Sequence, residues 1–202
     1  MTADQYCVLA NALAKAEADG ENPSAILAIR LLALTGCRRG EIERLQWHEV
    51  DLAGRCLRLS DSKEGKGIRP LGGAAAQLLT NVSRDGRYVL RGKTPDNPYV
   101  GLPKAWPRVV LRDELPELTP HGLRHAFASV AADLGFAELT IAALLGHGTH
   151  TITGRYLHHL DSSLLAAADD VSCEIAAMMA GRRTPAKIVP LRAVVRKTSY
   201  VP

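Results

Sequence analysis

Residues 119–158 read TPHGLRHAFASVAADLGFAELTIAALLGHGTHTITGRYLH and hold the strongest structural pattern of the chain. A first helix is expected to start after Thr119, a good N-cap, with Pro120 at the first helical position and Gly135 at its exit. A second helix is expected to end at Gly146, and a short third helix carries Tyr156. Polar side chains therefore fall at helix ends, where they can point into a shared cleft.

The first of these helices has two distinct faces. Its apolar residues recur at helical spacing and form one stripe, made of Leu123, Phe127, Val130 and Leu134. His121 and Arg124 lie on another face, roughly 120° from the centre of that stripe. The helix is expected to be anchored in the core by the stripe while it offers an imidazole and a guanidinium outward.

The same helix also carries a histidine spacing that is found in metal sites. His121 and His125 have the spacing of zinc ligands, but the pair lacks the Glu of the HExxH pattern. No metal site is predicted. A metal-dependent phosphoesterase using this pair and nearby acids remains an alternative, which a chelator would test.

Length and composition indicate one domain, or one domain with a tail. The chain has 202 residues, of which 47% are hydrophobic, enough for a single core. It has no apolar run of membrane-spanning length, and its start, MTADQY, lacks the parts of a signal peptide. Four cysteines without CxxC spacing suit reduced thiols. A cytoplasmic protein without membrane contact is expected.

The positive charge is unevenly distributed. The net charge is +4, but the residues from Arg182 onward carry six basic side chains and no acidic one, which leaves −2 on the rest. DNA binding by the body would therefore need a local basic patch. The candidates for that patch are Arg38, Arg39, Lys63, Lys66, Arg69 and Arg124. For Arg39 and Arg69 a plain solvated charge is an equal alternative.

The remaining pattern predicts an α+β protein, mainly helical with a small antiparallel β-hairpin. Helices are expected over about 3–19, from Asn22-Pro23 to Gly36, shortly after Arg38, over 73–84, around Pro103 and Pro107, and over 163–180. The segment 50–73 alternates as a hairpin with its turn at DSKEGKG, and residues 88–90 are expected to form a short strand.

Two separated motifs resemble the tyrosine recombinase (phage integrase) family. LLALTGCRRGEIERLQWHEVDL, residues 31–52, resembles its first arginine box, TG-x-R-x-x-E followed by L-x-W-x-D. HGLRHAFAS, LGH and RYLH, within residues 121–158, resemble its second box. The resemblance covers about residues 10–160 and implies the catalytic fold of that family.

The resemblance assigns roles residue by residue. The catalytic set it implies is Arg38, Lys63, His121, Arg124, His147 and Tyr156. Glu41 matches the supporting acid after the first arginine, and Lys66 lies in the same turn as Lys63 as an alternative hairpin lysine. Gly122 and Glu49 stand where the family more often has Asp. These two departures remove no catalytic group, so only local support is expected to change.

The implied chemistry is DNA strand breakage and rejoining. Two arginines would clamp the phosphate, Tyr156 would attack it, and Lys63 would protonate the leaving 5′ oxygen, without a cofactor. The implied partner is double-stranded DNA, held by a homotetramer; a monomer in solution is compatible with this. A type IB topoisomerase-like relaxing enzyme and a non-catalytic DNA-binding protein remain alternatives.

The implied organisation is a catalytic domain over 1–181 and a basic tail over 182–202. The N-terminal core-binding domain that family members usually carry is expected to be absent, because the chain starts just before the catalytic domain. A fragment and a naturally short protein both remain open.

Overall fold

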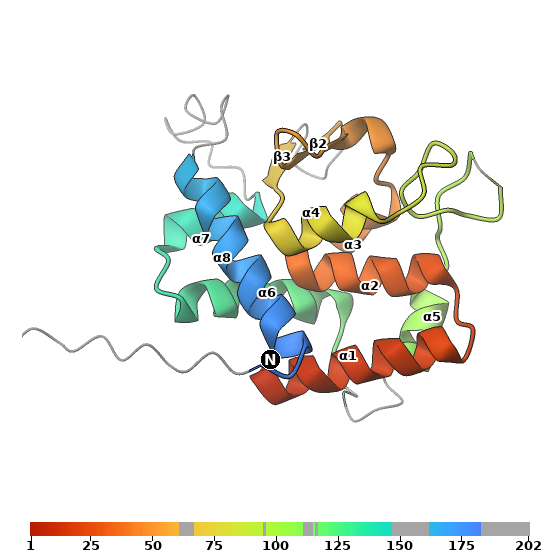
Figure 1. Cartoon of the computed structure of the whole chain (residues 1–202), viewed down its shortest axis with the longest axis horizontal. Helices are drawn as coiled ribbons and strands as arrows, with labels where there is room; N and C mark the ends of the chain where they lie inside the picture. The colour runs from red at the N-terminus through yellow and green to blue at the C-terminus, as the bar shows by residue number, and fades with distance from the viewer. Residues whose placement is uncertain (61–66, 95, 111–114, 116, 147–161, 183–202) are drawn as a thin grey trace, which may run out of the picture.

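The structure, a computed structural model, describes residues 1–60, 67–94, 96–110, 115, 117–146 and 162–182 (Figure 1). The helices are α1 Ala3–Ala18, α2 Pro23–Thr35, α3 Arg39–Glu43, the 3-10 helix η1 Trp47–Glu49, α4 Gly73–Thr80, α5 Leu102–Val109, α6 Pro120–Asp133, α7 Glu138–Leu145 and α8 Ser162–Met179. The strands β1 Val50–Asp51, β2 Cys56–Leu59 and β3 Gly67–Pro70 form one antiparallel sheet in the order β1-β2-β3. The predicted α+β class, mainly helical with a small sheet, is confirmed.

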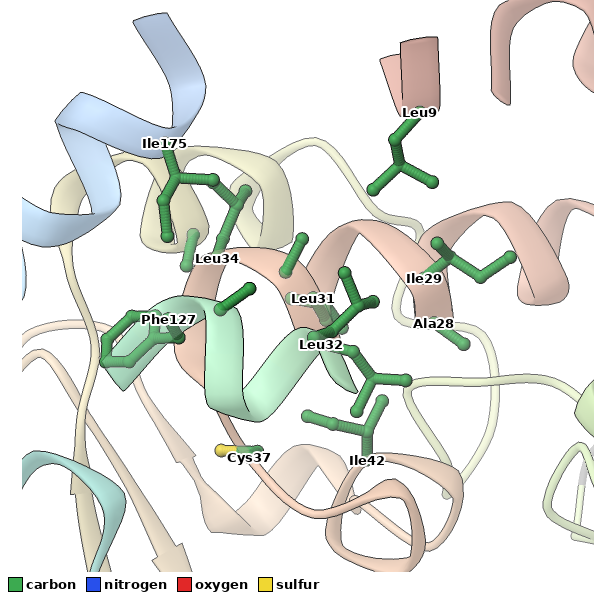
Figure 2. Close-up of a cluster of buried hydrophobic side chains, with 14 of the residues drawn as sticks. Leu9, Ala28, Ile29, Leu31, Leu32, Leu34, Cys37, Ile42, Phe127 and Ile175 are labelled. Atoms are coloured by element: carbon green, nitrogen blue, oxygen red, sulfur yellow. The ribbon is translucent and has the colours of Figure 1, made fainter. Parts of the chain in front are cut away.

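Helix α2 is the centre of the core. Nine of its thirteen residues are buried, so it is apolar on almost every side, as a helix enclosed by other elements must be. It packs against α1, α3, α4, α5, α6 and α8. Figure 2 shows side chains of other helices, including Leu9, Phe127 and Ile175, gathered around those of α2. The C-terminal end of α2 is thereby fixed from several directions, and Arg38 follows it directly.

Helix α8 closes the bundle. It contacts α1, α2, α4, α6 and α7, and in Figure 1 it crosses the view as the long blue helix. Its buried residues include Ala167, Ala168 and Val171, small side chains that allow a close approach. Together with α2 it holds α6 and α7 in place.

The predicted helix ends in the second motif are confirmed where they are described. The Thr119 hydroxyl accepts a hydrogen bond from the Gly122 N–H at 2.9 Å, with Pro120 at the first position of α6. Gly146 caps α7 in the left-handed conformation with φ +65°. Residues 147–161, including the predicted third helix, lie outside the described residues.

Three expectations were wrong in detail. The helix predicted over 73–84 ends at Thr80. Leu134 was expected in the buried stripe of α6 but is 42% exposed, because the helix ends at Asp133 and the chain turns away. Residues 88–90 form no strand, only an isolated bridge between Tyr88 and Gln46. The segment opposite them enters the 3-10 helix η1 at Trp47, so the ladder cannot continue.

The sheet register turns one basic side chain inward. Arg69 of β3 lies opposite Leu57 of β2, and cross-strand partners share a face of the sheet. Leu57 is 1% exposed and Arg69 is 3% exposed, so this face is buried, whereas Arg58 on the other face is exposed. The hairpin turn that follows Ser60 is outside the described residues.

No helix in the described part of the chain has the combination of length and apolar character that crossing a membrane requires.

Candidate active site

Arg38 lies at the corner between α2 and α3. Helix α2 ends at Gly36, whose φ of +61° turns the chain. A Cβ at that position would lie 2.7 Å from Cδ1 of Phe127, so the corner is pressed against α6. Arg38 is the N-cap residue of α3 and its side chain is 24% exposed. The backbone of this arginine is held rigidly while its guanidinium stays partly open to solvent.

Glu41 is the carboxylate of the site. Its Oε2 accepts the Arg38 backbone N–H at 2.9 Å, and its Oε1 accepts an N–H of the Arg38 guanidinium at 3.2 Å. The same Oε1 accepts the NH2 group of Arg69 at 2.7 Å. Burial alone would raise the pKa of Glu41, but the hydrogen bonds and positive charges of Arg69 and Arg38 outweigh it and lower that pKa. Glu41 is therefore a buried anion shared by two arginines.

Arg124 joins the ends of two helices. Its NH1 donates to the Gly36 carbonyl at 2.8 Å and its NH2 to the Leu145 carbonyl at 3.0 Å. Both acceptors lie at helix C-termini, where carbonyls lack helical partners and the helix dipole favours a cation. Burial, and then the charge of Arg38, lower the pKa of Arg124. The expectation that Arg124 points outward was wrong, because its side chain reaches inward to these carbonyls.

Cys37 shows how strongly charged this corner is. The thiol is 1% exposed, and burial, with a further contribution from Glu41, raises its pKa to about 11. The positive charges of Arg69 and Arg124 act in the opposite direction and lower the pKa of the same thiol. Cys37 is thus a neutral thiol among the charged side chains of Arg38, Arg69, Arg124 and Glu41. Together these four side chains carry a net positive charge.

His121 occupies the first turn of α6. It is exposed, one helical turn before Arg124, and its ring meets that of His125 edge to face with centroids 4.4 Å apart. The described residues contain no group of three or more His, Cys, Asp or Glu side chains placed to hold a metal ion. His121 and Arg124 thus belong to one helix, but only the imidazole faces solvent.

The remaining predicted site residues divide into three groups. Lys63, Lys66, His147 and Tyr156 lie outside the described residues. Arg39 is exposed and pairs with Glu43 at 3.6 Å. Arg69, expected to contact DNA, instead has a side chain that is 4% exposed and paired with the Glu41 carboxylate at 2.7 Å.

Glu49 has a structural role, which its place in the motif indicates only as local support. It is 6% exposed and accepts the Gln46 N–H at 3.0 Å, the Ser60 N–H at 2.8 Å and the Ser60 hydroxyl. Burial raises its pKa, but the hydrogen bonds from Ser60 and Gln46 outweigh burial and lower it. Glu49 therefore ties η1 to the end of β2, next to the hairpin turn. The sequence feature that indicates this role is the place of Glu49 at the acidic position of the L-x-W-x-D run.

Comparison with known proteins gives a consistent picture. The model of the phage integrase family matches residues 1–163. Prophage integrase IntF of Escherichia coli (strain K12) is 29% identical over 152 residues, covering 71% of this chain and 32% of the relative. Tyrosine recombinase XerD of Ralstonia nicotianae is 34% identical over 143 residues, covering 64% of this chain and 46% of the relative. This chain therefore spans less than half the length of either relative.

A solved structure supports the fold. The crystal structure of XerA recombinase superposes with a TM-score of 0.58 at 22% identity, covering 82% of this chain and 62% of that one. The family match extends over both arginine-bearing motifs and most of the described core. By that match, the chain belongs to the phage integrase family.

Proposed function

We propose that the chain is the catalytic domain of a site-specific DNA recombinase that breaks and rejoins strands through a 3′-phosphotyrosyl intermediate. The observation that carries the proposal is the meeting of Arg38 and Arg124 at the α2–α3 corner, with His121 one turn before Arg124. Membership of the phage integrase family supports it. The nearby Glu41 neutralises only part of this positive charge, which suits a phosphate ligand.

The two arginines would stabilise the transition state. Attack on a phosphodiester gathers negative charge on the nonbridging oxygens, and guanidinium groups neutralise it with paired, permanently charged hydrogen bonds. The buried Arg124 has a fixed head, whereas the half-buried Arg38 can meet the substrate from the solvent side. His121 and His147 would add hydrogen bonds and proton transfer near neutral pH.

Tyr156 would be the nucleophile. Its phenolate forms the bond to phosphorus while the bond to the 5′ oxygen breaks, and Lys63 gives that oxygen a proton. The product is a 3′-phosphotyrosine and a free 5′-hydroxyl. In the reverse sense, a 5′-hydroxyl of a partner strand attacks the phosphotyrosine, and the proton returns to Lys63. The scheme balances without a metal or a nucleotide cofactor.

The proposed setting is a DNA complex in the cytoplasm. Residues 1–181 would form the catalytic domain and 182–202 a basic tail, with double-stranded DNA as the partner and four protomers acting on two duplexes. The exposed Arg39 supports a contact to the DNA backbone, because its side chain is 49% exposed and its pair with Glu43 is long, at 3.6 Å. Lys66 is proposed for the same role from its place in the hairpin turn.

Covalent trapping tests the proposal. The protein is incubated with nicked duplexes that tile the sequence around its own gene, and denaturing gels reveal protein–DNA adducts. Wild type should form an adduct and Tyr156→Phe should not. An adduct that persists in Tyr156→Phe would refute the nucleophile, and activity abolished by a chelator would favour the phosphoesterase alternative.

A second assay separates recombination from relaxation. Two duplexes carrying the cleaved site are mixed, one labelled, and exchanged strands are measured beside the relaxation of a supercoiled plasmid that carries the site. Exchange is expected. Relaxation without exchange would identify a topoisomerase-like enzyme instead.

A further inference from the structure

Arg69 is a buried cation without an evident purpose in the sheet. It lies in β3 opposite Leu57, a position where an apolar residue would fill the space at no electrostatic cost. Only 4% of its side chain is exposed, and removing a charge from water costs several kcal/mol unless partners compensate. The contacts of this guanidinium therefore indicate what it does.

The first contact is the carboxylate that also holds Arg38. Oε1 of Glu41 is 2.7 Å from NH2 of Arg69 and 3.2 Å from NH1 of Arg38. The shorter bond goes to the buried arginine and the longer one to the partly exposed arginine. Arg69 thus takes a large share of the negative charge that would otherwise act on Arg38 alone.

The second contact is the end of α7. A Cβ at Gly146 would lie 1.7 Å from NH1 and 2.0 Å from Cζ of Arg69, so the guanidinium packs directly on the Gly146 backbone. Gly146 immediately precedes His147 in the sequence. Arg124 holds the adjacent Leu145 carbonyl at 3.0 Å. Two buried arginines therefore fix the turn from which the chain continues to His147.

We infer that Arg69 is a positioning residue for strand cleavage, linking β3, Glu41 and Gly146 without touching the substrate. This inference rests on the proposed function and adds a residue to it. Arg69 holds Glu41 so that Arg38 keeps a weak bond to the carboxylate and can exchange it for a phosphate oxygen. It also fixes the backbone of Gly146, the residue before His147 in the sequence.

Loss of Arg69 would have a characteristic effect. In Arg69→Met the buried Glu41 has lost its closest cation and would draw Arg38 inward, in competition with the phosphate. In the double variant Glu41→Gln/Arg69→Met that competition disappears, because the neutral amide binds a guanidinium more weakly. Removing the carboxylate should therefore partly restore the rate that removing Arg69 had lowered.

The experiment measures single-turnover cleavage at saturating DNA, and DNA affinity separately. Arg69→Met and Arg69→Lys should each cleave about tenfold or more slowly, with an affinity that changes far less, since misplaced catalytic groups cost rate more than binding. Lysine should not substitute, because it lacks the planar fork that pairs with Glu41 and packs on Gly146. The double variant should be faster than Arg69→Met.

Arg58→Met is the matched control. Arg58 lies in the same sheet, on its exposed face, and pairs with Asp51 at 2.9 Å. Its loss should leave the cleavage rate unchanged. Circular dichroism and melting curves establish that each variant folds; if Arg69→Met does not fold, Arg69→Lys and the double variant carry the comparison with wild type.

Three outcomes would overturn the inference. The first is an Arg69→Lys rate equal to that of wild type, and the second is a double variant no faster than Arg69→Met. The third is amide exchange at Gly146 no faster in the folded Arg69 variant than in Arg58→Met, which would break the link to α7. Failure of the proposed function would give a different result, because the wild-type protein itself would form no adduct. Amide exchange at Gly146 would still test the contact between Arg69 and Gly146 in that case.

Discussion

Arg124 donates a hydrogen bond of 2.8 Å to the carbonyl of Gly36, a residue 88 positions earlier in the chain. That bond joins the two arginine-bearing motifs, because Arg38 follows Gly36 by two residues and Arg124 belongs to α6. The second bond of Arg124, to Leu145, brings in the end of α7. One buried side chain thus holds together the three segments that would form the phosphate site.

Arg124→Lys should damage stability and cleavage together. A lysine cannot reach both carbonyls with a planar fork, so at least one buried acceptor loses its partner at a cost of about 1–3 kcal/mol. Urea denaturation measures this loss, and the adduct assay should show little or no cleavage. Arg91→Lys, at an exposed pair with Asp85, should change the free energy of unfolding by less than about 0.5 kcal/mol. Equal stabilities for the two variants would contradict the role given to Arg124.

Gly146→Ala should be far more harmful than Gly135→Ala. Both glycines have positive φ, +65° and +86°, so the backbone cost of alanine, about 1–2 kcal/mol, is similar in the two. At Gly146 the new Cβ would collide with Arg69, whereas at Gly135 no neighbouring atom among the described residues lies within 4 Å of it. The difference between the two melting temperatures therefore measures the collision. Similar losses would mean that the guanidinium moves aside freely.

Local features of the fold could be predicted from the sequence. Thr119, Pro120 and Gly146 mark helix ends because capping depends on a few neighbouring residues, and the structure confirms these three. The apolar run of α2 predicted a buried helix for the same reason. The resemblance of the two motifs predicted the family of the chain, and the family match confirms that prediction.

Features that depend on distant contacts could not be predicted. The burial of Arg69 follows from its pairing with Leu57, and nothing near Arg69 in the sequence fixes that register. The side chain of Arg124 was expected to be exposed, because helical periodicity predicts which face of the helix a residue occupies but not which elements pack against that face. The catalytic assignments of all six residues remain predictions: Arg38, Lys63, His121, Arg124, His147 and Tyr156.

Thr119→Ala should slow cleavage beyond its effect on stability. The lost cap bond to the Gly122 N–H is worth about 1 kcal/mol, and it frays the turn that carries His121. Thr2→Ala removes a comparable cap at the start of α1, where the Thr2 hydroxyl accepts the Gln5 N–H at 3.2 Å. The two variants should melt at similar temperatures while only Thr119→Ala cleaves more slowly. Equal cleavage rates for the two variants would show that the first turn of α6 does not contribute to cleavage.

Glu49→Gln should destabilise the protein in a pH-dependent way. The folded pKa of Glu49 lies below its ordinary value of 4.5, because the hydrogen bonds from Ser60 and Gln46 outweigh burial. The ionised carboxylate therefore stabilises the fold above about pH 4.5, and this contribution disappears as the pH falls through the folded pKa. Wild type should exceed Glu49→Gln in free energy of unfolding by about 1–3 kcal/mol at pH 7 and by less at pH 3.5, measured by urea denaturation.

Glu43 provides a control with the opposite sign. Burial, only partly offset by Arg39 and Arg44, raises its pKa above 4.5, so its ionised form is less favourable in the folded protein than in the unfolded chain. Glu43→Gln should therefore gain stability relative to wild type between pH 3.5 and pH 7, where Glu49→Gln loses it. If Glu49→Gln also gained stability over that range, the hydrogen bonds of Glu49 to Ser60 and Gln46 would not be what holds the start of the hairpin.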